Sequence, residues 1–213
     1  MKNPTPIRNI YCVGRNYRLH AAELGNAVPE RPMIFTKPTH AAVPWEREAA
    51  LPGSQGSVHY EAELVLLFAK PYEPGVSLDD VVSHFTVGLD FTLRDVQDGI
   101  KAKGYPWLPA KGFKNSAGLG AWLPFPGTAE LAEKDFSLRI GGTEVQRGNV
   151  RDMVFGLDEL SAFVAAHYGL GPGDALFTGT PAGVGRVSDG DELTLLWAEE
   201  SVGSAVVRLK TDE

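Results

Sequence analysis

The sequence predicts a mainly β protein with a few helices, of the α+β class. The first observation is that short apolar runs alternate with turn residues, because 24 Gly and 15 Pro are spread along 213 residues. The second is that only three segments have a sequence pattern typical of helices. The length fits one domain, here residues 1–213, in which residues 1–50 are richer in loop.

Runs of apolar and β-branched residues between turn signals predict the strands. The Ser204–Leu209 run shows the clearest alternation of apolar and polar residues. In chain order, the predicted strands are Asn9–Val13, Met33–Thr36, Glu61–Phe68, Phe85–Phe91, Ala121–Pro124, Ser137–Ile140, Ala175–Thr178, Leu193–Leu196 and Ser204–Leu209.

The predicted helices are Tyr17–Leu24, Thr92–Lys103 and Gly156–Gly169. Thr92 is expected to be the N-cap of the second, and Asp95 would favour its first turn through the helix dipole. The third carries an apolar stripe, and Gly169 is the expected stop.

Composition excludes several functional classes. The 20 basic and 27 acidic residues leave a net charge of −7, without a polybasic block, which argues against nucleic acid and anionic membranes as partners. No apolar run approaches the roughly 20 residues of a membrane span, and the N-terminus lacks a secretory signal. Cys12 is the only cysteine, so no intrachain disulfide forms and a reducing cytoplasm is the expected compartment.

The segment His59-Tyr60-Glu61-Ala62-Glu63-Leu64 contains two carboxylates at strand spacing. Alternation places Glu61 and Glu63 on one face, with Val65 further along that face. Like charges on a face that becomes apolar are costly, and a divalent cation between them would remove the repulsion. A solvated strand end is the simpler alternative for this segment alone.

A third carboxylate favours the metal site over the solvated strand end. Asp90 ends an apolar strand that runs into the second helix, although a turn or capping role is the commoner one for such an aspartate. Together with Glu61 and Glu63 it forms an all-oxygen ligand set, which suits Mg²⁺ or Mn²⁺ and suits Zn²⁺ poorly.

Four collinear stretches carry a resemblance to a known family: Cys12–Tyr17 (C-V-G-R-N-Y), His59–Leu64, Leu89–Gln97 and Phe177–Gly185 (F-T-G-T-P-A-G-V-G). Together they resemble the fumarylacetoacetate hydrolase family, particularly its short single-domain members, which include acylpyruvate hydrolases and oxaloacetate decarboxylases or tautomerases. The resemblance implies a mixed β-sandwich roll, a homodimer and one Mg²⁺ or Mn²⁺ per subunit.

The same resemblance implies a role for each of nine residues. His20 and Glu23 would lie on a lid helix within the N-terminal segment, and His59 would be structural or support the ligands. The implied roles are metal binding for Glu61, Glu63 and Asp90, catalysis for His20, Glu23 and Lys111, and substrate binding for Arg15, Gln97 and Thr180.

The implied chemistry starts from a small 2-oxo acid. Its carboxylate and keto oxygens would chelate the cation, and the metal-bound enolate would be the common intermediate. The leading hypothesis is C–C hydrolysis of acylpyruvates, with oxaloacetate decarboxylation as a second activity. The alternatives are an isomerase, decarboxylase or oxaloacetate tautomerase, and a dimeric metal- or metabolite-binding protein without turnover.

Overall fold

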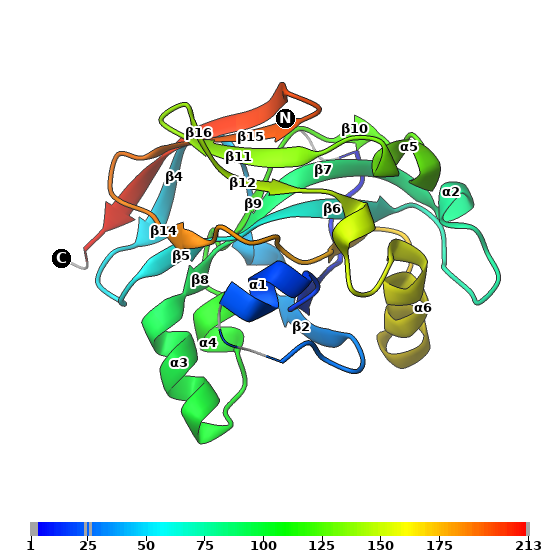
Figure 1. Cartoon of the computed structure of the whole chain (residues 1–213), viewed down its shortest axis with the longest axis horizontal. Coiled ribbons are helices and arrows are strands. Elements are labelled where there is room, and N and C mark those ends of the chain that lie inside the picture. Colours follow the sequence, from blue (N-terminus) through cyan, green and yellow to red (C-terminus); the bar gives the residue numbers. More distant parts are fainter. Residues whose placement is uncertain (1–3, 24, 26, 212–213) are drawn as a thin grey trace.

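Strands predominate in the computed structural model, which describes residues 4–23, 25 and 27–211 (Figure 1). Among these residues the strands form sheets of eight, five and three strands, so the mainly β class with a few helices is confirmed. The helical elements are α1 (Arg18–Glu23), α2 (Leu78–Val81), α3 (Arg94–Lys103), α4 (Leu108–Lys111), α5 (Thr128–Ala132), α6 (Leu157–Tyr168) and the 3-10 turns η1 (Thr39–Ala41) and η2 (Val150–Asp152).

The eight-stranded sheet has a mixed topology that gathers several chain segments at one edge. Its order is β2 (Met33–Lys37), β1 (Asn9–Gly14), β13 (Asp174–Phe177), β6 (Ala62–Phe68), β7 (Val82–Asp90), β9 (Ala117–Leu119) and β3 (Ala42–Pro44), with β10 (Leu123–Pro124) paired to β7. β1 and β13 are parallel, whereas β6 is antiparallel to both β13 and β7. The ends of β1, β13 and β7 therefore meet the start of β6.

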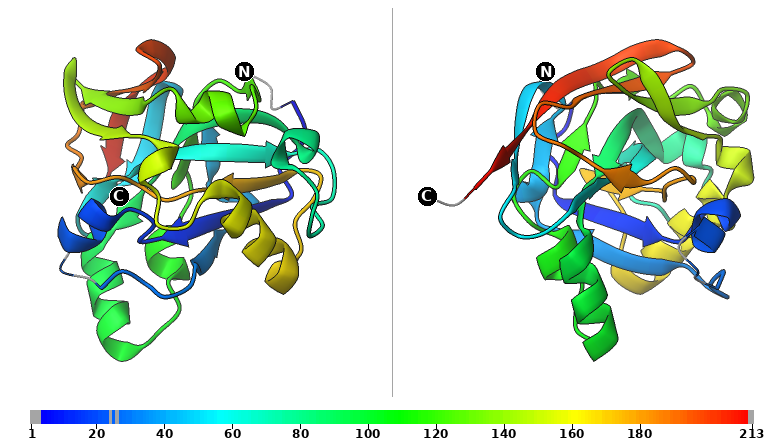
Figure 2. Two further views of the ribbon diagram at one scale, coloured as in Figure 1. Left: turned by 45° about the vertical axis from the view of Figure 1, so that its right-hand side comes forward. Right: turned by 60° about the vertical axis from the view of Figure 1, so that its left-hand side comes forward.

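Two smaller sheets complete the strand arrangement (Figure 2). The five-stranded sheet has the order β12 (Thr143–Gly148), β11 (Phe136–Ile140), β15 (Glu192–Trp197), β16 (Glu200–Lys210) and β4 (Glu46–Pro52). The three-stranded sheet has the order β14 (Gly185–Arg186), β5 (Val58–Tyr60) and β8 (Thr92–Leu93).

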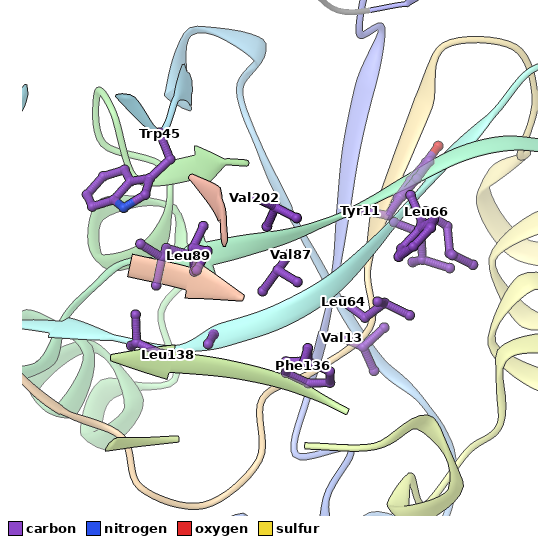
Figure 3. Close-up of a cluster of buried hydrophobic side chains, with 14 of the residues drawn as sticks. Tyr11, Val13, Trp45, Leu64, Leu66, Val87, Leu89, Phe136, Leu138 and Val202 are labelled. Atoms are coloured by element: carbon purple, nitrogen blue, oxygen red, sulfur yellow. The ribbon is translucent and has the colours of Figure 1, made fainter. Parts of the chain in front are cut away.

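The main core lies where β6 and β7 face β11 of the second sheet (Figure 3). Leu64, Phe136 and Leu138 are fully buried there, and burial of each such side chain contributes about 1.5–3 kcal/mol. Along β6, Ala62, Leu64, Leu66 and Phe68 belong to this core, whereas Val65 belongs to a second cluster with Ile10, Cys12 and Phe177. The predicted alternation is confirmed, and the strand is buried on both faces.

Several predicted boundaries differ from the structure. Thr92 is not a helix cap: it pairs with His59 in β8, and α3 begins at Arg94 after Leu93. Asp95 does lie in the first turn of α3, where Oδ2 also accepts a hydrogen bond of 2.6 Å from Ser57 N. Glu61 immediately precedes β6 rather than starting it.

The other predicted helices are confirmed to within a residue or two. α6 ends at Tyr168, and the next residue, Gly169, is its C-cap with a φ of +83°, which favours glycine. α1 begins at Arg18, and Leu24, the predicted end of that helix, lies outside the described residues. No helix in the described ranges is both long enough and apolar enough to cross a membrane.

Candidate metal centre

Three carboxylates meet at the edge where β6 begins and β7 ends. Glu61, Glu63 and Asp90 each offer an oxygen, and these three oxygens lie within 4.8 Å of one another. The backbone explains the meeting, because Asp90 N donates to Glu61 O at 2.8 Å and Glu63 pairs with Gly88. All three residues are at most 5% exposed, which excludes the solvated strand end considered from the sequence.

Glu61 lies between two basic side chains. Oε2 accepts from Lys111 Nζ at 2.7 Å, and Oε1 accepts from Arg94 Nη2 at 2.5 Å. Burial by itself would raise the pKa of Glu61, but Lys111 and Arg94 outweigh it and hold that pKa well below its usual range. Glu61 is therefore a carboxylate over the whole physiological pH range.

Lys111 links two of the three carboxylates. It comes from α4 and is 3% exposed, and its Nζ also donates to Asp90 Oδ2 at 2.7 Å. Burial opposes the charge, but Asp90 and Glu61 outweigh it and raise the pKa of Lys111, so the ammonium persists at neutral pH.

A second buried lysine was not found by sequence reasoning. Lys37, the last residue of β2, lies with Nζ 2.7 Å from Asp90 Oδ1 and also donates to Phe91 O and Lys111 O. The sequence signal for a buried Lys37 is its position at the end of the strand-forming run Met-Ile-Phe-Thr. Arg94, the first residue of α3, was likewise not predicted as part of the site.

Glu63 differs from the other two carboxylates in its partners. Among the described residues it forms no ion pair, and its Oε2 accepts one hydrogen bond of 2.7 Å from Gly179 N. Burial, followed by repulsion from Asp90 and Glu61, raises the pKa of Glu63 well above its usual range.

The donor set fits a hard divalent cation. Asp90 Oδ1 is buried and has no hydrogen-bond partner among the described residues, because Lys37 forms an ion pair with it outside hydrogen-bonding angles. A cation would satisfy that oxygen and offset the repulsion around Glu63, and an all-oxygen set favours Mg²⁺ or Mn²⁺ over softer metals.

The Gly-Arg-Asn-Tyr segment lies beside the Gly-Thr-Pro loop because β1 and β13 run parallel. Asn16 joins the two: its Nδ2 donates to Thr178 O at 2.8 Å and to Phe155 O at 3.1 Å, and its Oδ1 accepts from Phe155 N at 2.8 Å. Gly179 packs on Asn16 with φ +100°, and an added Cβ would lie 2.6 Å from Asn16 Cβ. This close packing fixes the amide that contacts Glu63.

Thr180 is buried at the cavity wall, but its hydroxyl is already used. Oγ1 donates its proton to Ala62 O at 2.8 Å and accepts from Gln146 Nε2 at 2.9 Å. A hydroxyl has one proton, so a substrate carboxylate would have to break the bond to Ala62 to be bound by it. Gln146 supports the loop further, since its Oε1 accepts from Ala62 N at 2.8 Å.

His20 and Glu23 lie on α1 at the other side of the cavity. His20 is 5% exposed, and its Nδ1 lies 3.5 Å from Glu23 Oε2. Burial lowers the pKa of His20 more than Glu61 and Glu23 raise it, so the imidazole is neutral at pH 7. Glu23 in turn accepts from Gly183 N at 3.2 Å, which ties α1 to the Gly-Thr-Pro loop.

The structure brings eight of the nine predicted site residues to one cavity. Glu23 is the exception, since it contacts the cavity only through His20, and His59 lies outside with Nε2 3.1 Å from Ser57 Oγ. The cavity is lined by Val13, Gly14, Arg15, His20, Met33, Phe35, Glu61, Glu63, Asp90, Arg94, Gln97, Lys101, Trp107, Lys111 and Thr180.

The family to which this chain belongs follows from its match to a family model. Residues 9–209 match the family model described as fumarylacetoacetate (FAA) hydrolase C-terminal. The chain belongs to the fumarylacetoacetate hydrolase family. The mixed β-sandwich roll that the resemblance implied is therefore confirmed, and the carboxylate cluster lies inside the matched range.

Similar proteins in this family have the names of enzymes that act on keto acids. The chain is 37% identical over 205 residues to oxaloacetate tautomerase YcgM of Escherichia coli, covering 95% of this chain and 94% of that protein. It is 38% identical over 185 residues to the mitochondrial oxaloacetate tautomerase fahd-1 of Caenorhabditis elegans, covering 85% and 86%.

Solved structures of the family share the fold closely. Fumarylpyruvate hydrolase from Pseudomonas aeruginosa, in complex with Mn²⁺ and pyruvate, superposes with a TM-score of 0.85 at 33% identity, covering 99% of this chain and 93% of that one. The 5-carboxymethyl-2-hydroxymuconate delta-isomerase from Mycobacterium smegmatis has a TM-score of 0.82 at 28% identity, with 98% and 82% covered. The family thus includes both isomerases and hydrolases on this fold.

Proposed function

We propose that the protein is a divalent-metal-dependent enzyme of small 2-oxo acids, and that its reaction is the keto–enol tautomerisation of oxaloacetate. The observation that carries the proposal is the cluster of Glu61, Glu63 and Asp90, three buried carboxylates with oxygens within 4.8 Å of one another. The 37% identity to an oxaloacetate tautomerase over 95% of the chain supports the choice of reaction.

Glu61, Glu63 and Asp90 would hold one Mg²⁺ or Mn²⁺, the cofactor we propose. When bound, this cation would act as a Lewis acid toward the substrate's keto oxygen and stabilise the negative charge that develops there. The Mn²⁺ in the fumarylpyruvate hydrolase structure supports such a cation.

The chain's own residues would supply the remaining steps. Neutral His20 can accept the proton that leaves the substrate carbon next to the keto group and return it to oxygen, which balances the tautomerisation. Glu23 would orient the imidazole, and Lys111 adds a fixed positive charge beside the developing oxyanion. Arg15 and Gln97 remain the proposed contacts to substrate carboxylates.

The second candidate is C–C hydrolysis of acylpyruvates, the leading hypothesis from the sequence. The His20–Glu23 pair favours it, because a histidine with a glutamate 3.5 Å from its Nδ1 can act as the base that activates water. The similarity to a fumarylpyruvate hydrolase supports it too. Hydrolysis needs water at the distal carbonyl, whereas tautomerisation and oxaloacetate decarboxylation do not.

The test compares three assays on metal-free protein reloaded with Mg²⁺ or Mn²⁺: oxaloacetate enol-to-keto conversion, pyruvate release from oxaloacetate, and acetylpyruvate cleavage. Metal without protein is run in parallel, because free cations act on oxaloacetate as well. Glu63→Gln should abolish the protein-dependent rate, and the exposed Glu159→Gln is the matched control. Absence of all three activities with metal bound would refute an enzymatic role and leave a metal- or metabolite-binding protein.

Two further properties are proposals as well. We propose a homodimer, which light scattering of the purified protein would test. We also propose a cytoplasmic location, because the single cysteine, Cys12, is a free buried thiol, as in most proteins of reducing compartments. Some relatives are named mitochondrial, and fractionation of the source cells would distinguish the two.

A further inference from the structure

The cations that line the cavity fall into two pairs. Arg94 and Lys111 are neutralised by direct ion pairs with Glu61 and Asp90. Arg15 and Lys101 also line the cavity, but neither forms an ion pair with any carboxylate in the described part of the chain. The cavity therefore combines an acidic wall, where the cation would bind, with two positive charges that form no ion pair with any residue that the structure describes.

Lys101 is directed to this cavity by its position on α3. Arg94, Gln97 and Lys101 follow a spacing of three and four residues, so they share one face of the helix, and all three line the cavity. Side chains on a helix lean toward its N-terminus, which brings the Lys101 ammonium back from its turn toward Arg94.

The ammonium of Lys101 also has a defined apolar support. Its Nζ lies 5.4 Å from the centroid of the Trp107 ring, and Trp107 is itself part of the cavity wall. Burial lowers the pKa of Lys101 most, and Arg94 lowers it further. Asp98 raises this pKa, but the smaller contributions of Arg15 and Lys111 lower it again. An anion bound at this place would offset the repulsion among these cations.

Arg15 reaches the same cavity from a strained backbone. It follows β1 with φ of +60°, a left-handed conformation that costs a non-glycine residue free energy. The packing of Asn16 against Thr178 and Phe155 holds this turn in place. Its conformation is therefore imposed by the fold, which places at the cavity a second cation without an ion pair to any described residue.

We infer that Lys101 and Arg15 bind the second carboxylate of a 2-oxo dicarboxylic acid whose 2-oxo acid end lies at Glu61, Glu63 and Asp90. Lys101 is thus a specificity-determining residue that favours dicarboxylates over neutral-tailed acylpyruvates. The inference deepens the proposed function and rests on it for the placement of the 2-oxo acid end.

The experiment uses two ligands that differ only in the terminal group. Malate and 2-hydroxybutyrate are unreactive here, and the second has a methyl group where the first has its distal carboxylate. Their binding to the Mn²⁺-loaded protein is measured by calorimetry in wild type, Lys101→Gln, Lys101→Arg and Lys103→Gln. Lys103 is exposed on the same helix and absent from the cavity wall, so its variant controls for net charge.

Lys101→Gln should weaken malate binding about tenfold, as expected for loss of a charge-assisted hydrogen bond, and leave 2-hydroxybutyrate binding unchanged. Lys101→Arg should retain most of the malate affinity, and Lys103→Gln should retain all of it. In steady state, Lys101→Gln should raise KM for oxaloacetate about tenfold with little change in kcat, and leave KM for acetylpyruvate unaltered.

The inference is overturned if wild type binds malate no more tightly than 2-hydroxybutyrate, or if Lys101→Gln weakens both ligands equally. These binding results are independent of turnover, so they remain decisive if the proposed reaction fails. Conversely, oxaloacetate turnover with an unchanged KM in Lys101→Gln refutes the role of Lys101 and leaves the proposed function intact.

Discussion

The ammonium of Lys111 lies 2.7 Å from Oδ2 of Asp90, and both residues are at most 3% exposed. Two buried charges in direct contact are costly to separate, because removing one leaves the other desolvated and unpaired. Lys111 is thus both a structural counter-ion of the carboxylate cluster and a charge placed for catalysis.

Lys111→Met should lower the free energy of unfolding of the metal-free protein by about 3–5 kcal/mol. Mn²⁺ should restore part of this loss, since it supplies positive charge to the same carboxylates. Urea unfolding with and without Mn²⁺ measures both effects. Lys134→Met is the control, because the exposed Lys134–Glu130 pair should contribute less than about 1 kcal/mol. Equal effects of the two substitutions would contradict this account.

Glu61→Gln and Glu63→Gln should differ in their effect on the stability of the metal-free protein, although each replaces one carboxyl group of the cluster. Glu61→Gln leaves Lys111 and Arg94 without a charged partner and should destabilise the metal-free protein by about 3–5 kcal/mol. Glu63→Gln removes a buried carboxyl group that has no ion-pair partner among the described residues and whose ionisation burial disfavours, so the metal-free protein should be as stable as wild type or more so.

Thermal unfolding in EDTA and in Mn²⁺ tests this pair of variants. Both should lose most of the stabilisation that Mn²⁺ gives to wild type, because stabilisation by a ligand grows with the ratio of its concentration to its Kd for the folded state, and each substitution raises that Kd. An undiminished response of Glu63→Gln to Mn²⁺ would remove Glu63 from the metal site.

The pH dependence of activity should follow His20. Burial lowers the pKa of its imidazole below 6.5, so the neutral form that accepts a proton persists in slightly acidic solution. The acid limb of kcat/KM should therefore have its midpoint below pH 6.5, and it should disappear in His20→Gln together with most of the activity. An acid limb that survives this substitution would assign the base to another group.

The same shift has a consequence for stability. A histidine whose pKa is lowered on folding contributes stability above its unfolded pKa of about 6.5, and this contribution is lost as pH falls through the folded pKa. His20→Gln should therefore reduce the drop in Tm between pH 7 and pH 5.

Asn16→Ala should destabilise the protein by at least about 2 kcal/mol, because Phe155 N and Thr178 O would lose buried hydrogen bonds. The Gly-Thr-Pro loop should loosen as well, and the Gly179 amide should no longer be fixed beside Glu63. Urea unfolding measures the first effect, and Mn²⁺ affinity measures the second. Wild-type Mn²⁺ affinity in this variant would show that the loop does not position Glu63.

The sequence by itself determined the strand-rich class and the carboxylate cluster. Both depend on local pattern: alternation along His59–Leu64 puts Glu61 and Glu63 on one face, and an apolar run ends at Asp90. The family motifs added the remaining candidates, of which all but Glu23 line the cavity directly.

Only the tertiary structure decided which charges are paired and which are free. Lys37 and Arg94 reach Asp90 and Glu61 across 53 and 33 residues of chain, and the hydroxyl of Thr180 is committed to Ala62 across 118. Such contacts depend on strand order and side-chain reach, which no local pattern encodes. Desolvation and nearby charge are also set by distant neighbours. The raised pKa of Glu63 and the lack of an ion pair at Lys101 within the described ranges therefore follow from the fold and not from their own sequence segments.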